Sequence, residues 1–180
     1  MKTRFSHAAA FGMATSIAVI ILALIIYLAG LKNSALNYLS YPIAIAIGCI
    51  GVKKWREQNG GYLTYGQTYV HLILQTLVYS AVITIWTLIF MLYIAPGMME
   101  DQMLIQQANM EEKGMSQAEI DMAMHYARKF TSPGMMTIFA FLGNTIFMGL
   151  IHLIVAAIMK KDPPAFQPPA APFTNYPPQA

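Results

Sequence analysis

Four long hydrophobic stretches constrain the fold of this chain more than any other feature. The first, residues 8–31, runs for 24 residues without a charged side chain. A helix of that length, at about 1.5 Å per residue, is long enough to cross a hydrocarbon core of roughly 30 Å. Residues 35–52, 69–95 and 134–159 form three further stretches of the same character. The sequence therefore predicts an all-α membrane protein with four transmembrane helices.

The charge content supports a membrane setting. Charged residues make up 11% of the 180-residue chain, against roughly 25% in soluble domains. The single cysteine, Cys49, lies in the second stretch, so no disulfide framework and no cysteine metal site is expected. Basic residues fall in small clusters at the ends of the stretches, which argues against nucleic-acid binding. The expected partners are the lipid bilayer and other membrane proteins, and no cofactor is expected.

The long polar segment between the third and fourth stretches is predicted to form a helical hairpin over residues 97–131. Ser116 and Glu119 have the spacing of a capping box, which starts a helix. Gly114 suits the left-handed position that ends the preceding helix. Ser132 and Pro133 then supply the start signal for the final span.

The distribution of charge predicts how the chain crosses the membrane. The two termini and the connector after the second span together carry seven basic and two acidic residues. The opposite side, which includes the hairpin, carries four basic and six acidic residues. By the positive-inside rule, both termini are expected in the cytoplasm and the hairpin outside, in a bacterial inner membrane.

Small and polar residues within the spans indicate how the helices contact one another. Ala8, Gly12 and Ser16 recur every four residues, and Ala44 and Gly48 form a second pair, so both faces allow close helix approach. Hydroxyl residues on one face of the third span are expected to meet neighbouring helices: Thr76, Ser80, Thr84 and Thr87.

The ionisable and basic residues near the span ends have their own predicted roles. His71, near the start of its span, is expected to anchor that helix at the interface. His152 is expected to hydrogen-bond to a neighbouring helix, and a proton or ion role is the alternative. The run Lys53 to Glu57, which includes Trp55, is expected to end the second span at the membrane surface.

Methionine is concentrated in one part of the chain, with nine of the 14 between Met98 and Met136. Met99, Met103 and Met110 share one face of the first hairpin helix and are expected to pack against Ile120 and Met124 of the second. Thioethers together with His125, which follows Met122 by three residues, would also suit Cu(I), so a copper site is the alternative interpretation.

Two sets of residues are candidates for contacts with other proteins. The first set lies on the hairpin, away from the predicted seam between its helices: Leu104, Ile105, Met122 and Tyr126. The second lies in a proline-rich cytoplasmic tail, residues 162–180, which is expected to be disordered on its own. Its aromatic residues would serve as anchors: Phe166, Phe173 and Tyr176.

The order and spacing of several short motifs resemble a bacterial four-span inner-membrane family of the Gram-negative, Bacteroidetes type that is known only as a domain of unknown function. The motifs include Asn59-Gly60-Gly61, Thr64-Tyr65-Gly66-Gln67, Gly114-Met115-Ser116, and the exit Lys129-Phe130-Thr131-Ser132-Pro133. The resemblance covers about residues 5–161. It implies an integral inner-membrane protein and brings no known catalytic residues.

No catalytic motif stands out in the chain. It has no nucleophilic triad pattern, no HExxH, no P-loop and no glycine-rich dinucleotide turn. The interpretation is therefore a non-enzymatic accessory subunit of a larger membrane assembly. A small transporter or copper-handling protein is the alternative, and a membrane enzyme comes third. The absence of charged residues within the spans favours the first interpretation over transport.

Overall fold

A computed structural model describes residues 4–31 and 35–164, and every regular element in these two ranges is a helix. In chain order these are α1 (Arg4–Leu28), the 3₁₀ helix η1 (Ala35–Leu39), α2 (Ser40–Gln58), α3 (Tyr65–Ile89), the π-helical turn η2 (Phe90–Ile94), α4 (Met98–Glu112), α5 (Gln117–Phe130) and α6 (Pro133–Met159). Four helical segments are long and apolar enough to cross a membrane: Arg4–Leu28, Ala35–Gln58, Tyr65–Ile94 and Pro133–Met159. The predicted fold class is confirmed.

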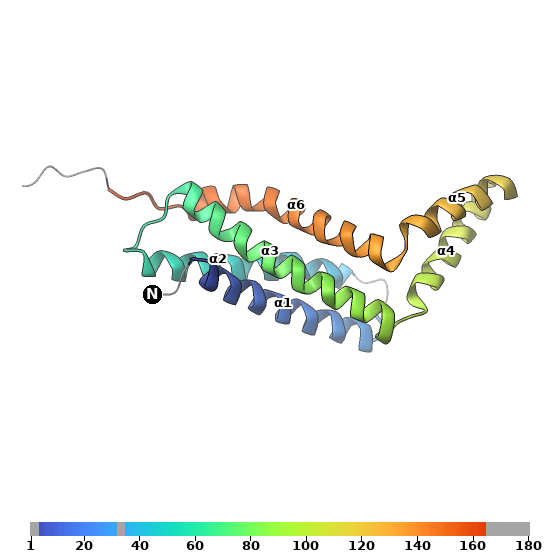
Figure 1. Cartoon of the computed structure of the whole chain (residues 1–180), viewed down its shortest axis with the longest axis horizontal. Coiled ribbons are helices and arrows are strands. Elements are labelled where there is room, and N and C mark those ends of the chain that lie inside the picture. Colours follow the sequence, from blue (N-terminus) through green and yellow to red (C-terminus); the bar gives the residue numbers. More distant parts are fainter. Residues whose placement is uncertain (1–3, 32–34, 165–180) are drawn as a thin grey trace, which may run out of the picture.

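The four long helices lie side by side, and the α4–α5 hairpin projects from one end of the bundle (Figure 1). The start of α1 and the end of α6 lie at the opposite end. Helix α3 is the centre of the arrangement, because it packs against both α6 and α1, while α2 packs mainly against α1. Apolar side chains on the outer faces of α1 and α6, such as Ile21, Ile25, Ile146 and Ile154, are exposed. These faces are the surface that meets lipid in this multi-pass membrane protein.

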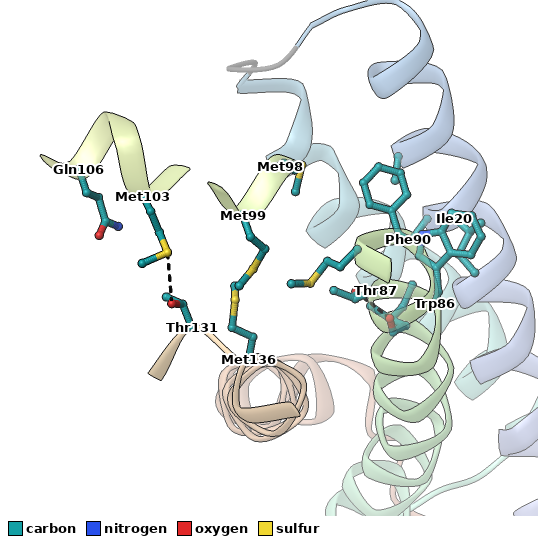
Figure 2. A pocket seen from close by; sticks show the side chains of 14 residues that line it. Ile20, Trp86, Thr87, Phe90, Met98, Met99, Met103, Gln106, Thr131 and Met136 are labelled. Carbon is teal, nitrogen blue, oxygen red and sulfur yellow. Dashed lines mark hydrogen bonds between the residues drawn. The ribbon is translucent and has the colours of Figure 1, made fainter. Parts of the chain in front are cut away.

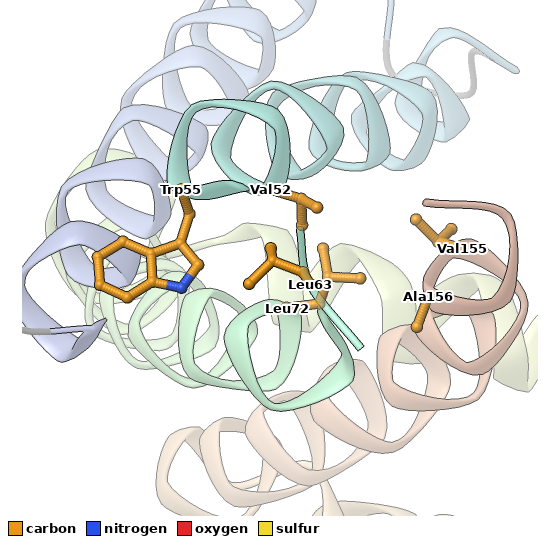
Figure 3. Packing of buried hydrophobic residues seen from close by; sticks show 6 residues of the cluster. All are labelled: Val52, Trp55, Leu63, Leu72, Val155 and Ala156. Carbon is orange, nitrogen blue, oxygen red and sulfur yellow. The ribbon is translucent and has the colours of Figure 1, made fainter. Parts of the chain in front are cut away.

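Helix α2 continues past the predicted end of the second span, through Lys53 and Lys54 to Gln58. The Trp55 side chain is 8% exposed and belongs to a buried apolar cluster (Figure 3). The other members are Val52, Leu63, Leu72, Val155 and Ala156. Facing inward lets the indole contact neighbouring helices, while lysines on the same helix remain exposed.

The end of the bundle opposite the hairpin is held together by backbone hydrogen bonds between segments distant in sequence. Leu63 and Lys161 exchange two of them: the Leu63 N–H donates to the Lys161 carbonyl at 2.9 Å, and the Lys161 N–H to the Leu63 carbonyl at 2.8 Å. The Arg56 guanidinium donates to the Met159 carbonyl at 3.3 Å. The end of α6 is therefore tied to the α2–α3 connector.

The predicted helix starts are present. The Thr64 N–H donates to the Gln67 side chain at 3.0 Å, and the Gln67 N–H donates to the Thr64 hydroxyl, which together make a capping box at the start of α3. At the start of α5, the Glu119 carboxylate accepts from both the N–H and the hydroxyl of Ser116, at 2.9 and 2.7 Å. Gly114 ends α4 with φ of 74°, the left-handed conformation that glycine adopts without strain.

The small-residue faces also lie where they were predicted. Ala8, Gly12 and Ser16 are all buried, as are Ala44 and Gly48. At Gly12 the contact with α3 is so close that an added Cβ would lie 2.7 Å from the carbonyl oxygen of Gln75. Glycine is therefore what lets α1 and α3 approach closely at this point.

Candidate functional site

The hairpin presents apolar side chains on its outer surface. All four predicted contact residues on it are more than half exposed: Leu104, Ile105, Met122 and Tyr126. Ile120 and Met124, by contrast, are buried on α5. The helical period of 3.6 residues puts Met122 and Tyr126 on the side of α5 that faces away from Ile120 and Met124. The hairpin thus has a covered seam and two uncovered apolar outer sides, one on each helix.

The turn of the hairpin carries one electrostatic feature. Hydrogen bonds from the hydroxyl and the backbone N–H of Ser116 hold the pKa of the Glu119 carboxyl below its ordinary value of 4.5. Both hydrogen bonds are stronger to the ionised carboxylate than to the protonated carboxyl, so they stabilise the ionised form. The start of α5 therefore favours the carboxylate.

The other predicted contact residues, Phe166, Phe173 and Tyr176, lie outside the described residues.

A cavity of about 430 Å³ lies where the hairpin joins the bundle (Figure 2). We call it the hairpin cavity. Its walls come from α1, the end of α3 with η2, the first three turns of α4, the α5–α6 connector and the start of α6. The lining residues are Val19, Ile20, Ala23, Ile83, Trp86, Thr87, Phe90, Met91, Met98, Met99, Met103, Gln106, Thr131 and Met136.

Methionines form much of the hairpin side of this cavity. Met99 of α4 and Met136 of α6 extend toward one another, and Met103 lies near Thr131 (Figure 2). The Thr131 hydroxyl is 3.9 Å from the Met103 sulfur. Met99 lies in the first turn of α4, level with the base of the hairpin, so it lines the cavity together with Met103. Met122 and His125 are not part of this lining; both are exposed on α5.

The π-helical turn at the end of α3 shapes the opposite wall. In it, the Ala95 N–H donates to the Phe90 carbonyl at 2.8 Å, five residues back. This widened turn carries Phe90 and Met91, both of which line the cavity. Such turns are rare and occur often at functional sites.

A second internal feature is a layer of buried polar side chains, which we call the buried polar layer: His7 of α1, His71, Gln75 and Thr76 of α3, and His152 of α6. The His71 ring stacks on Trp55 with centroids 5.4 Å apart and lies 5.2 Å from the His7 ring. His71 is fully buried, so the prediction that it anchors its helix at the interface is wrong. Trp55 and His7 cover it from two neighbouring helices.

Gln75 occupies the space left by two glycines of α2. A Cβ at Gly51 would lie 3.2 Å from the side-chain carbon Cδ of Gln75, and one at Gly48 would lie 3.5 Å from Oε1. The Cβ at Gly48 would also lie 4.0 Å from Nε2 of His152. A cavity of about 10 Å³, close to the size of one water molecule, lies between Gln75 and His152.

His152 makes the interhelical hydrogen bond predicted for it, with 3.1 Å between Nδ1 and the Thr76 hydroxyl oxygen. That hydroxyl also lies 3.0 Å from the Leu72 carbonyl, to which it donates. A hydroxyl has one proton, so the Nδ1–H of a neutral His152 donates to Thr76. Further along the same two helices, the Asn144 amide donates to the Ser80 hydroxyl at 2.7 Å.

The buried polar layer shows what the sequence-based reasoning missed. The shared face of hydroxyl residues on α3 correctly predicts that Thr76 and Ser80 lie against α6. His71 and Gln75, spaced i, i+4, form a second buried face toward α1 and α2. The i, i+4 spacing of His71 and Gln75, together with Gly48 and Gly51 on α2, is the sequence signal from which this second face could have been predicted. Within the described residues, no group of three His, Cys, Asp or Glu side chains is placed to hold a metal ion.

Comparison with known proteins gives one match. A family described as a protein of unknown function (DUF4199) matches residues 10–161. No curated protein and no solved structure matches the chain. The match covers the four spans and the hairpin between them.

Proposed function

This chain belongs to the DUF4199 family of proteins of unknown function, and we propose that it is an accessory subunit of a larger membrane assembly, acting through protein contacts. The observation that carries the proposal is the pair of apolar outer sides on a hairpin that projects beyond the bundle (Figure 1). In water, exposed Leu, Ile, Met and Tyr side chains retain apolar area whose burial is worth about 25 cal/mol per Å². A partner that covers both sides gains that free energy.

The charge of the hairpin favours a protein over the lipid surface as this partner. The hairpin carries six acidic and three basic residues. Bacterial inner membranes carry anionic lipid, which repels a net negative segment. With its termini in the cytoplasm, the protein holds the hairpin outside the cytoplasm, where a second envelope protein is the available partner.

The proline-rich tail supplies a second contact in this proposal. Its seven prolines in residues 163–180 favour an extended conformation that peptide-recognition grooves bind at low entropic cost. Phe166, Phe173 and Tyr176 are spaced along it as anchors. Deleting residues 163–180 should weaken a specific association and leave membrane insertion intact.

Purification of the native complex in mild detergent tests the role of the hairpin. The triple variant Leu104→Ser, Ile105→Ser and Tyr126→Ser should lose a co-purifying protein that the wild type retains. A matched variant, Asn109→Ser with Ala118→Ser, alters exposed hairpin positions that carry no large apolar side chain and should keep that protein. Because the three replaced side chains are more than half exposed, the stability of the triple variant should change by only about 0.5 kcal/mol per site. Unchanged co-purification in the triple variant would refute the proposal.

A small transporter or copper-handling protein is the second candidate function, and one observation favours it. Five methionines line the hairpin cavity: Met91, Met98, Met99, Met103 and Met136. Thioethers are soft ligands that suit Cu(I). Micromolar Cu(I) binding by the wild type that is lost when Met99, Met103 and Met136 are replaced by Leu would support this candidate. Met122→Leu, on the outer side of the hairpin, is the control.

A further inference from the structure

We propose that the hairpin cavity binds one acyl chain of a zwitterionic phospholipid from the surrounding bilayer. The volume of the cavity, about 430 Å³, falls within the range of about 300–1,000 Å³ that small-molecule sites occupy. It lies at the level where the membrane-spanning part of α3 ends and the polar hairpin begins. This site is separate from the outer sides of the hairpin that carry the proposed protein contacts.

The chemistry of the lining selects an apolar, uncharged group. None of the fourteen lining residues has a charged side chain. Two of the few polar groups already donate hydrogen bonds to their own helices: the Thr87 hydroxyl to the Ile83 carbonyl at 2.8 Å, and the Thr131 hydroxyl to the Ala127 carbonyl at 2.6 Å. A charged ligand would lose its hydration here without gaining partners, whereas a hydrocarbon chain loses nothing.

The cavity can be reached from the apolar surface of the bundle. Two lining side chains are partly exposed, Met98 at 42% and Met136 at 36%. Phe139, which lies one helical turn from Met136 on α6, is also exposed. A chain can therefore enter from the lipid phase without passing a charged group. Flexible methionine side chains adapt to chains of different length and unsaturation.

Charged residues at the base of the hairpin complement a zwitterionic headgroup. Glu100 and Asp101 are exposed in the first turn of α4, and Arg128 and Lys129 are exposed in the last turn of α5. Both pairs lie at the base, because one helix begins there and the other ends there. The two basic side chains can form charge-assisted hydrogen bonds with a lipid phosphate, and the two acidic side chains with the ammonium group of the same lipid. An anionic headgroup would leave the acidic pair opposed to its charge.

Photo-crosslinking of the full chain in lipid nanodiscs tests this inference. The discs contain phosphatidylethanolamine and a trace of the same lipid with a diazirine on one acyl chain, and the adducts are mapped by mass spectrometry. We expect adducts to concentrate on the peptides that contain Ile83–Met91 and Met98–Gln106. Ala23→Phe should reduce these adducts about tenfold, the loss expected when about two methylene groups are excluded from the cavity. Met98→Trp, at a residue that is 42% exposed, should also reduce these adducts.

Each variant has a matched control on α1. Ala14→Phe makes the same substitution at an exposed position outside the cavity, and Met13→Trp does so at a residue that is 44% exposed. Both controls should keep the wild-type adducts. Equal labelling in Ala23→Phe, Met98→Trp and their controls would overturn the acyl-chain site, as would adducts that are equally dense at lipid-facing Ile25 and Ile146. Equal labelling by a phosphatidylglycerol probe with the same chain would overturn the headgroup assignment.

Discussion

The Nδ1 atom of His152 and the hydroxyl oxygen of Thr76 lie 3.1 Å apart between α6 and α3. Both side chains are buried, at 3% and 2% exposure, so neither group can exchange this partner for bulk water. Helices α3 and α6 pack against each other, and this pair joins them in the half of the bundle away from the hairpin. Loss of this hydrogen bond should therefore lower the free energy of unfolding.

Thr76→Val should lower the free energy of unfolding by about 1–3 kcal/mol, because it leaves the Nδ1 proton of His152 buried without an acceptor. Thermal unfolding in detergent, or steric trapping in bicelles, measures the change. The control is Thr87→Val, since the Thr87 hydroxyl bonds only to its own helix at Ile83. The double variant Thr76→Val with His152→Leu should recover part of the loss. Equal stability of Thr76→Val and wild type would show that the bond contributes nothing.

Gly51→Ala should destabilise the bundle by about 1–3 kcal/mol through overpacking. The new Cβ would lie 2.9 Å from Cγ of Phe11 and 3.2 Å from Cδ of Gln75, so α2 would have to move away from α1 and α3. Gly66→Ala is the matched control, because nothing lies within 4 Å of its added Cβ. Shortening the neighbour, as in Gly51→Ala with Gln75→Ala, should restore part of the stability. Unchanged stability of Gly51→Ala would show that the packing around Gly51 has room for a methyl group.

Acid should weaken the start of α5. The pKa of Glu119 is lowered in the folded hairpin by the Ser116 hydroxyl and N–H, so its stabilising contribution is complete above the ordinary value of 4.5 and is lost as pH falls through the lowered value. A ¹³C NMR titration of the Glu119 carboxyl should give a midpoint below 4.5. Ser116→Ala removes the hydroxyl donor and should raise that midpoint toward 4.5. The same midpoint in both proteins would rule out the hydroxyl as the principal cause.

The spans and the hairpin could be predicted from sequence because each depends on local signals. Uncharged stretches located the four long helices to within a few residues at most ends, and Ser116 with Glu119 located the start of α5. The exposure of Leu104, Ile105, Met122 and Tyr126 followed from the helical period alone.

The features that were missed depend on how distant elements meet. Trp55 and His71 lie near span ends, where an aromatic or imidazole ring is equally compatible with the interface and with the bundle interior. Only the packing of α1 and α2 against α3 decides between these two placements. The hairpin cavity likewise needs α1, α3, α4 and α6 in their relative positions, which no single periodic pattern contains.

The most direct test of this account is the sidedness of the hairpin, because the proposed partner and the four-span topology both require it. Single cysteines at Ser116 and at Asn59, in a background with Cys49→Ala, can be labelled in intact cells and in lysed membranes with a membrane-impermeant maleimide. Ser116 lies at the hairpin turn, and Asn59 lies in the exposed α2–α3 connector at the other end of the bundle. We predict that the cysteine at position 116 reacts in intact cells and the one at position 59 only after lysis. Reaction of both positions from the same side of the membrane would contradict the account.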